Sequence, residues 1–256
     1  MNRATDLAYV RYQVTDLVRM EAFLTDFGMV PALPCDGSRL LMRGSGDAPY
    51  IYEAVLGDTC RFLGAGLRVA SHEDLARLSA LPGSSAIEPV GEVPDGGERV
   101  RMRMPDGFEI DALHGGAAHG RPSEAADLGF NSARHKARRN QAVRVAREAW
   151  VDHHCMPVLG TPEPGVHHCS FEMDGLDAVM CAHDFLMERG YTLDCGVGRH
   201  LLGSQIFDYW RDPFGFRIEH YTDGDVVNHA HQPSVFAGTA DETTQWCAKP
   251  PKDFFE

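Results

Sequence analysis

Hydrophobic and polar positions follow the same order three times along the chain. The clearest instance lies near residue 168, where the alternation over residues 170–173 predicts a half-buried strand. Apolar side chains then recur at helical spacing, at Leu176, Val179, Ala182 and Leu186. Segments 8–28 and 66–83 repeat this order of alternating strand, polar turn and amphipathic helix ending near glycine. The pattern predicts three strand–helix units.

A second repeat consists of a turn followed by a short strand. The sequence MPDGFEIDALHG (104–115) matches RDPFGFRIEHYTDG (211–224), and Asp111 stands where the later copy has Glu219. Each unit is therefore a strand and a helix followed by several strands. One such unit cannot bury both faces of its sheet, so we expect the units to pack in pairs.

The repeats predict an α+β protein made of tandem βαβββ modules. We place module one at about residues 6–60, module two at 61–115 and a complete late module at 165–225. At 256 residues, of which 43% are hydrophobic, the chain is long enough for one large or two small cores.

Composition limits the classes of partner and compartment. The net charge of −13 disfavours nucleic acid, because phosphate binding needs a basic face. The sequence has no apolar run long enough for a membrane helix and no apolar block typical of a secretory signal. Seven scattered cysteines without a CxxC pair indicate reduced thiols. We therefore expect a cytoplasmic protein that binds neither nucleic acid nor membrane.

Four motifs in the last third of the chain carry candidate chemistry: HHCSFE (167–172), GVGRH (196–200), FDYWRDPFGFRIEHY (207–221) and DGD (223–225). As a set they resemble the vicinal oxygen chelate superfamily, and within it the type I extradiol ring-cleaving dioxygenases. The resemblance is strongest over residues 152–225 and only topological over residues 6–115. It implies paired modules that form curved mixed sheets around a cavity for metal and substrate. It also implies an enzyme that opens a catechol-type aromatic diol with O2 at non-haem Fe(II), with Mn(II) as the alternative metal.

The resemblance assigns roles to five residues. His168 and Glu219 match metal-ligand positions, as part of a facial triad of two histidines and one carboxylate. His154, fourteen residues before His168, matches the acid–base histidine. His200 matches a histidine at the pocket mouth, and Tyr209 matches a tyrosine that hydrogen-bonds at the substrate oxygen.

Two further residues are expected to have structural roles. His167 should point to the face opposite His168, since successive side chains of a strand alternate. Asp111 should be structural, because no histidine accompanies it in the first strand of module two and Tyr9 occupies that place in module one.

The chain departs from the family pattern before His154, where a strand with the first histidine ligand should stand and is not found. Segment 116–150 is polar, basic and too short for the missing module, and its remaining histidines are His119 and His135. Its basic run is expected to be an exposed linker or helix with solvated charges. The expected organisation is a non-catalytic module pair (1–115), a basic linker or module remnant (116–150), a catalytic-type module (151–225) and a tail (226–256).

Three explanations of the missing ligand remain open. In the first, His168, Glu219 and a substitute, His154 or His135, hold iron and the chain cleaves a catechol. In the second, two chains pair their late modules into a two-His, two-Glu site like those of metal-dependent glyoxalases. In the third, the chain is a metal-free scaffold or small-molecule-binding protein. Retention of His154, His200 and Tyr209 together favours the first explanation, and a homo-oligomer is expected.

The tail shows neither a helical nor a strand period. We expect it to wrap the surface or to pack near the pocket, and Pro250 and Pro251 suit an extended course.

Overall fold

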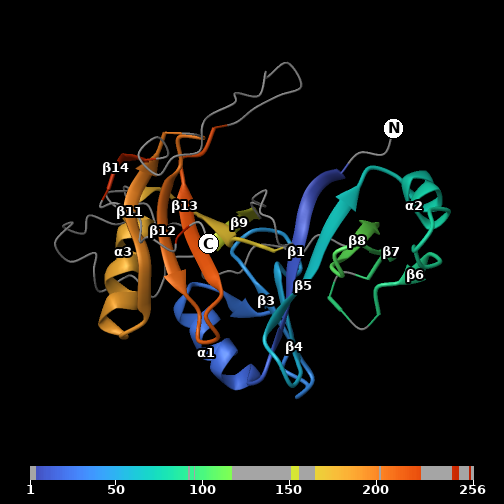
Figure 1. The fold of residues 1–256 in the computed structure, drawn as a ribbon, viewed down its shortest axis with the longest axis horizontal. Coiled ribbons are helices and arrows are strands. Elements are labelled where there is room, and N and C mark those ends of the chain that lie inside the picture. Colours follow the sequence, from blue (N-terminus) through green and yellow to red (C-terminus); the bar gives the residue numbers. More distant parts are fainter. Residues whose placement is uncertain are drawn as a thin grey trace.

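The computed structural model describes residues 4–91, 93–94, 96–116, 151–155 (backbone), 165–201, 203–225, 244–247 and 254. Within these residues the chain forms two mixed β-sheets that share one apolar core (Figure 1). Residues 116–150 of the predicted linker are outside the described part, apart from Gly116.

The first sheet has eight strands in the order β2-β3-β4-β1-β5-β8-β7-β6. Its elements are β1 (Ala4–Val14), α1 (Leu17–Asp26), β2 (Val30–Pro31), β3 (Arg39–Arg43), β4 (Tyr52–Leu56), β5 (Arg61–Val69), α2 (His72–Ser79), β6 (Glu88–Pro89), β7 (Glu98–Arg103) and β8 (Glu109–His114). β1 and β5 pair antiparallel at the centre, and each has a parallel neighbour, β4 and β8 respectively. Two βαβββ units therefore join through their first strands.

The polar turns predicted before the helices are N-caps. The side chain of Asp16 accepts the backbone N–H of Arg19 at the start of α1, and Ser71 accepts that of Asp74 at the start of α2. Each cap satisfies a backbone donor that has no partner inside the helix. None of the helices in the described residues is long and apolar enough to cross a membrane.

The second sheet has six strands in the order β14-β11-β12-β13-β10-β9. Its elements are β9 (Val151–Cys155), β10 (Cys169–Met173), α3 (Leu176–Glu188), β11 (Thr192–His200), β12 (Ile206–Arg211), β13 (Arg217–Thr222) and β14 (Thr244–Trp246). β10 and β13 run parallel, as β5 and β8 do in the first sheet. β10, α3, β11, β12 and β13 thus follow one another in the βαβββ order, with α3 on the outer side of the sheet (Figure 1).

Two short strands were not expected from the sequence. β14 lies in the tail, where we predicted no strand, and pairs with the edge of β11. β9 pairs antiparallel with β10, in the position that β1 takes beside β5. β9 has five residues and β14 has three, which are too few to show an alternating pattern in the sequence. Each pairs with the edge of the sheet through backbone hydrogen bonds. The strand position beside β10 is therefore filled, although the sequence showed no strand for it.

The two sheets are joined by aromatic packing around α1. The ring of Phe27, just after α1, stacks on His220 of β13 with centroids 3.6 Å apart, and His220 Nε2 is 2.8 Å from the Phe27 carbonyl. Tyr12 of β1 packs on Phe216, which precedes β13, at 4.7 Å. Burial of this apolar surface fixes the second sheet against the first.

Candidate functional site

The candidate site lies on one face of the second sheet. Glu219 of β13 has Ser170 of β10 on one side and Tyr209 of β12 on the other. Residues opposite each other in neighbouring strands share a face, so these three form a row. His168, just before β10, places Nε2 3.0 Å from Glu219 Oε2. The structure thus brings together both predicted metal ligands, which are almost completely buried.

The two carboxylate oxygens of Glu219 have different surroundings. Oε2 accepts the Ser170 hydroxyl hydrogen bond and faces His168. Oε1 is buried and has no hydrogen-bond partner. A buried carboxylate oxygen without a donor is costly, and a cation would remove that cost. This orphaned oxygen, beside an imidazole nitrogen, fits a divalent metal ion.

Tyr209 and His200 form a second pair beside the first. The Tyr209 hydroxyl and His200 Nε2 share a hydrogen bond of 2.8 Å. The Tyr209 ring meets the His168 ring edge to face, with centroids 5.0 Å apart. His200 also stacks on Phe207 at 4.2 Å. A phenol and an imidazole, both able to donate or accept a proton, therefore adjoin the buried His168–Glu219 pair.

His167 does not point away from this face, so the prediction of the opposite face is wrong. Its Nδ1 lies 2.5 Å from His168 Nδ1, and its Nε2 contacts the Phe254 carbonyl. The alternation rule does not apply, because β10 begins only at Cys169. Burial lowers the pKa of the His167 imidazole to about 4, which keeps it neutral near neutral pH.

The opposite face of the same sheet holds a buried aspartate that pairs with a histidine of α3. Asp208 accepts the indole N–H of Trp210 at 2.7 Å and lies 3.0 Å from His183 Nδ1. Burial raises the pKa of the Asp208 carboxyl, whereas the hydrogen bond to Asp208 raises the pKa of His183. These groups fix β12 against α3 behind the site row.

His154 lies in β9, the strand next to β10. In the ladder, Cys155 is opposite Ser170 and His154 is opposite Phe171, which belongs to the apolar core. The register slips between Phe171 and Met173, so two β9 residues, 152 and 153, stand against one residue of β10. The backbone of β9 thus places two consecutive histidines, His153 and His154, next to β10, the strand that follows His168.

Four of the five predicted site residues gather in one place, and the fifth lies on the neighbouring strand. Among the side chains that the structure describes, no group of three or more His, Cys, Asp or Glu is arranged to hold a metal ion. His119 and His135 lie outside the described residues. The described side chains therefore supply two of the expected ligands.

The first sheet has a carboxylate in the position equivalent to Glu219, and an arginine of the same sheet pairs with it. Asp111 of β8 is opposite Gly66 of β5, as Glu219 is opposite Ser170. Arg101 donates to both Asp111 oxygens at 2.7 and 2.8 Å, and the Tyr9 hydroxyl donates at 2.8 Å. Burial alone would raise the pKa of Asp111, but the bonds to Arg101 and its charge lower it. A guanidinium thus satisfies this carboxylate.

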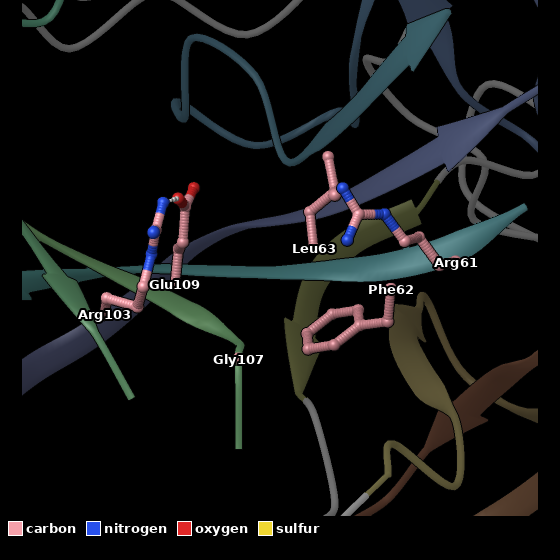
Figure 2. Close-up of a pocket in the computed structure, with 6 residues that line it drawn as sticks. All are labelled: Arg61, Phe62, Leu63, Arg103, Gly107 and Glu109. Atoms are coloured by element: carbon pink, nitrogen blue, oxygen red, sulfur yellow. Dashed lines mark hydrogen bonds and ion pairs between the residues drawn. The ribbon is translucent and has the colours of Figure 1, made fainter. Parts of the chain in front are cut away.

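A pocket of about 350 Å³ lies at the first sheet, and none of the candidate site residues lines it (Figure 2). Its lining consists of Arg61, Phe62, Leu63, Arg103, Gly107 and Glu109. The charged side chains are already engaged: Arg103 pairs with Glu109 at 3.3 Å, and Arg61 reaches Gln13 at 3.4 Å. Because its lining residues all belong to the first sheet or its loops, the pocket is separate from the candidate metal site in the second sheet.

Two features of the site were missed from the sequence. The contact of Phe254 with His167 joins residues 87 positions apart, and the ring of Phe254 packs on Tyr209 at 5.0 Å. Phe254 of the tail thus packs beside the candidate site. No local pattern identifies such a partner, although an aromatic pair, Phe254 and Phe255, at the end of a polar tail was a signal for docking.

Comparison with known proteins places this geometry in context. No family model matches the chain. Metapyrocatechase 2 of Cupriavidus necator is 30% identical over 104 residues, which are 40% of this chain and 32% of that protein. The match therefore spans about a third of the curated relative's length.

Several solved structures resemble the whole chain. The Mn(II)-bound glyoxalase from Novosphingobium aromaticivorans matches with a TM-score of 0.78 and 24% identity, covering 98% of this chain and 94% of that one. The 2,3-dioxygenase of Pseudomonas sp. KL28 matches at 0.70 and 20%, covering 91% and 97%. Homoprotocatechuate 2,3-dioxygenase of Brevibacterium fuscum, in complex with 3,4-dihydroxyphenylacetate, matches at 0.74 and 17%, covering 98% and 92%.

These similarities establish the fold. The chain has the vicinal oxygen chelate fold, with two curved mixed sheets and few helices, as predicted. The resemblance to glyoxalases and extradiol dioxygenases stated from the sequence motifs is confirmed at this level.

Proposed function

We propose that this protein is an extradiol ring-cleaving dioxygenase that opens a catechol-type aromatic diol with O2. The observation that carries the proposal is the buried His168–Glu219 pair with its orphaned carboxylate oxygen, next to the hydrogen-bonded Tyr209–His200 pair. The similarity to metapyrocatechase 2 and to two 2,3-dioxygenases supports it.

His168 Nε2 and the Glu219 carboxylate would hold Fe(II), with Mn(II) as the alternative. When bound, such a metal leaves open coordination positions at which a diol and O2 meet. His168 directly precedes β10 and Glu219 lies on the parallel neighbour β13, so the β10–β13 ladder holds the two residues close together. The buried carboxylate would offset part of the metal's charge in a site shielded from water.

Tyr209 and His200 would handle the substrate. The Tyr209 hydroxyl lies beside the His168 ring and would donate a hydrogen bond to a diol oxygen. His200 Nε2, 2.8 Å from that hydroxyl, orients it and would receive or return its proton. We assign the acid–base role to His154 on the motif resemblance, and the backbone of its strand, β9, lies next to β10.

A third protein ligand is proposed from β9. The Ser170–Glu219 row continues into β9 at Cys155, and the bulge sets residues 152 and 153 against Glu172, two residues further along β10. Since side chains alternate along a strand, Glu172 shares the face of Ser170. The backbone register thus sets His153 against the β10 residue that shares the face of Ser170, and we propose His153 as the third ligand.

The test is metal content combined with turnover. Protein purified without oxygen should contain about one equivalent of iron or manganese per chain in this reading, and His168→Ala should lose it. Iron-loaded wild type should form the yellow ring-fission product from a panel of catechols in air. A folded, iron-loaded protein that forms none across the panel contradicts the proposal.

A second candidate is a glyoxalase-like isomerase or lyase. It is favoured by the TM-score of 0.78 to the Mn(II)-bound glyoxalase and by the presence of two ligand-type residues among the described side chains. In that case two chains would pair to form a two-His, two-Glu site. Metal-loaded protein would then be a dimer with glyoxalase activity. A metal-loaded monomer excludes this arrangement, and a protein that binds no metal would be a small-molecule-binding scaffold.

A further inference from the structure

His167 lies between the proposed ligand His168 and the tail residue Phe254. Its Nδ1 is 2.5 Å from His168 Nδ1, and its Nε2 contacts the Phe254 carbonyl and lies 2.6 Å from Arg217 Nη1. Arg217 is buried, donates to the same carbonyl at 2.9 Å and pairs with Asp194. Its guanidinium also lies over the Phe254 ring at 4.3 Å.

The close approach of two imidazole nitrogens restricts where their protons lie. Two Nδ1 atoms at 2.5 Å share one proton, so one ring donates and the other accepts. To bind a metal through Nε2, neutral His168 must carry its proton on Nδ1 and donate it to His167 Nδ1. His167 must then carry its own proton on Nε2, where the Phe254 carbonyl accepts it.

A competing arrangement uses the same atoms. Arg217 donates to His167 Nε2, His167 donates from Nδ1 to His168, and His168 donates from Nε2 to Glu219 Oε2 at 3.0 Å. In this arrangement His168 Nε2 carries a proton and has no lone pair for a metal. The two arrangements differ in whether the Phe254 carbonyl or Arg217 engages His167 Nε2.

We propose that His167 is a positioning residue that sets the tautomer of His168, and that the docked Phe254 carbonyl selects the tautomer able to bind metal. The inference rests on the proposed role of His168 as a ligand. It couples the C-terminal tail to metal affinity through one hydrogen-bonded ring. Partners of this kind typically change metal affinity by about 10–100-fold when removed.

The experiment measures Mn(II) affinity by titration under anaerobic conditions, without diol, for three variants of His167. His167→Asn keeps an acceptor at the place of Nδ1, whereas His167→Gln keeps a polar group only at the place of Nε2. We expect His167→Ala and His167→Gln to weaken Mn(II) binding by about 10–100-fold, and His167→Asn to restore most of it. His72→Gln, at an exposed histidine, is the matched control and should bind as wild type.

Removal of residues 254–256 tests the tail. The deletion should weaken Mn(II) binding in wild type and have no further effect in His167→Ala, because both act through one hydrogen bond. Equal affinity of the Asn and Gln variants, or additive effects of deletion and His167→Ala, overturns the inference. Should His167→Ala not fold, the Asn–Gln comparison still decides. If His168→Ala keeps full affinity, the proposed ligand itself is wrong, which is a separate result.

Discussion

Equivalent carboxylates in the two sheets have opposite surroundings, and single neighbouring residues cause the difference. Asp111 is opposite Arg101 of β7, which neutralises it, whereas Glu219 is opposite Tyr209 of β12, which does not. Burying an uncompensated carboxylate oxygen is unfavourable, and this supports the proposed metal-ligand role of Glu219. The sequence repeat aligned the two carboxylates, but it did not show that Arg101 reaches the first of them.

Substitution of Tyr209 tests the proton-handling pair. Tyr209→Phe keeps the ring contact with His168 and removes the hydroxyl that bonds His200 Nε2. Loss of one hydrogen bond to a developing charge costs about 1.5–3 kcal/mol, so kcat for ring cleavage should fall about 10–100-fold. Iron content should stay at the wild-type value, since the hydroxyl is not a ligand. Iron loss together with activity would show that Tyr209 supports the metal instead.

Among the helices and strands, those whose apolar positions recur with a clear period were predicted from the sequence. The three strand–helix units and the two Pro-x-Gly-Phe turns followed from alternation, helical spacing, the turn repeat and polar residues such as Asp16 and Ser71, which cap the helices. β9 and β14 could not be predicted, because they are short edge strands held by backbone pairing. The same limit hid the direction of His167, whose place depends on where β10 begins.

Substitutions of the two neighbouring histidines of β9 should have different effects on iron binding and on turnover. His153→Ala should abolish tight iron binding, because His153 is the proposed third ligand, whereas His154→Ala should retain iron and lose about 100-fold or more in kcat, because His154 is the proposed acid–base residue. Iron analysis and single-turnover rates on anaerobically prepared protein separate the two effects. The reverse pattern, with iron lost only in His154→Ala, would show that the register of β9 changes when metal binds.

Substitution of Asp111, which pairs with Arg101 across the β7–β8 ladder, should lower the free energy of unfolding without changing metal content. Asp111→Asn leaves Arg101 without its bidentate carboxylate partner, although Glu109 remains 3.5 Å away. We expect a loss on the order of 2 kcal/mol in unfolding free energy, below the roughly 3–5 kcal/mol of fully buried pairs because Arg101 is partly exposed. Urea unfolding measures it, and metal content should not change. Glu219→Gln is the matched control, which should lose metal while the metal-free protein keeps its stability.

At the scale of the molecule, the site depends on how the second sheet is held against the first. The turn between β12 and β13 carries Asp212, whose Oδ1 accepts the backbone N–H groups of Phe214 and Phe216 at 2.8 and 2.9 Å. Phe216 in turn packs on Tyr12 of β1. This turn therefore joins the sheet interface to the strand that carries Glu219, and its carboxylate is buried.

Asp212 makes stability depend on pH in a direction opposite to that of most paired carboxylates. Burial raises the pKa of its carboxyl to about 6, well above the ordinary value of an aspartate. Between pH 6 and 4 the folded protein takes up a proton that the unfolded chain does not, so this group adds stability as pH falls and costs about 3 kcal/mol above pH 6. Asp212→Asn keeps the amide acceptor without the charge. We therefore expect unfolding free energy at pH 8 to rise, and its slope between pH 6 and 4 to decrease, in urea titrations.

A matched control separates this effect from the general titration of carboxylates. Asp36 is exposed, and its side-chain hydrogen bond to Ser38 lowers its pKa, so Asp36→Asn should not raise stability at pH 8. Asp208, whose pKa burial also raises, leaves a residual slope in Asp212→Asn. A drop in stability at pH 8 for Asp212→Asn would mean that the charge strengthens the turn hydrogen bonds by more than its burial costs. The sheet interface would then weaken, rather than tighten, when the carboxyl takes up a proton.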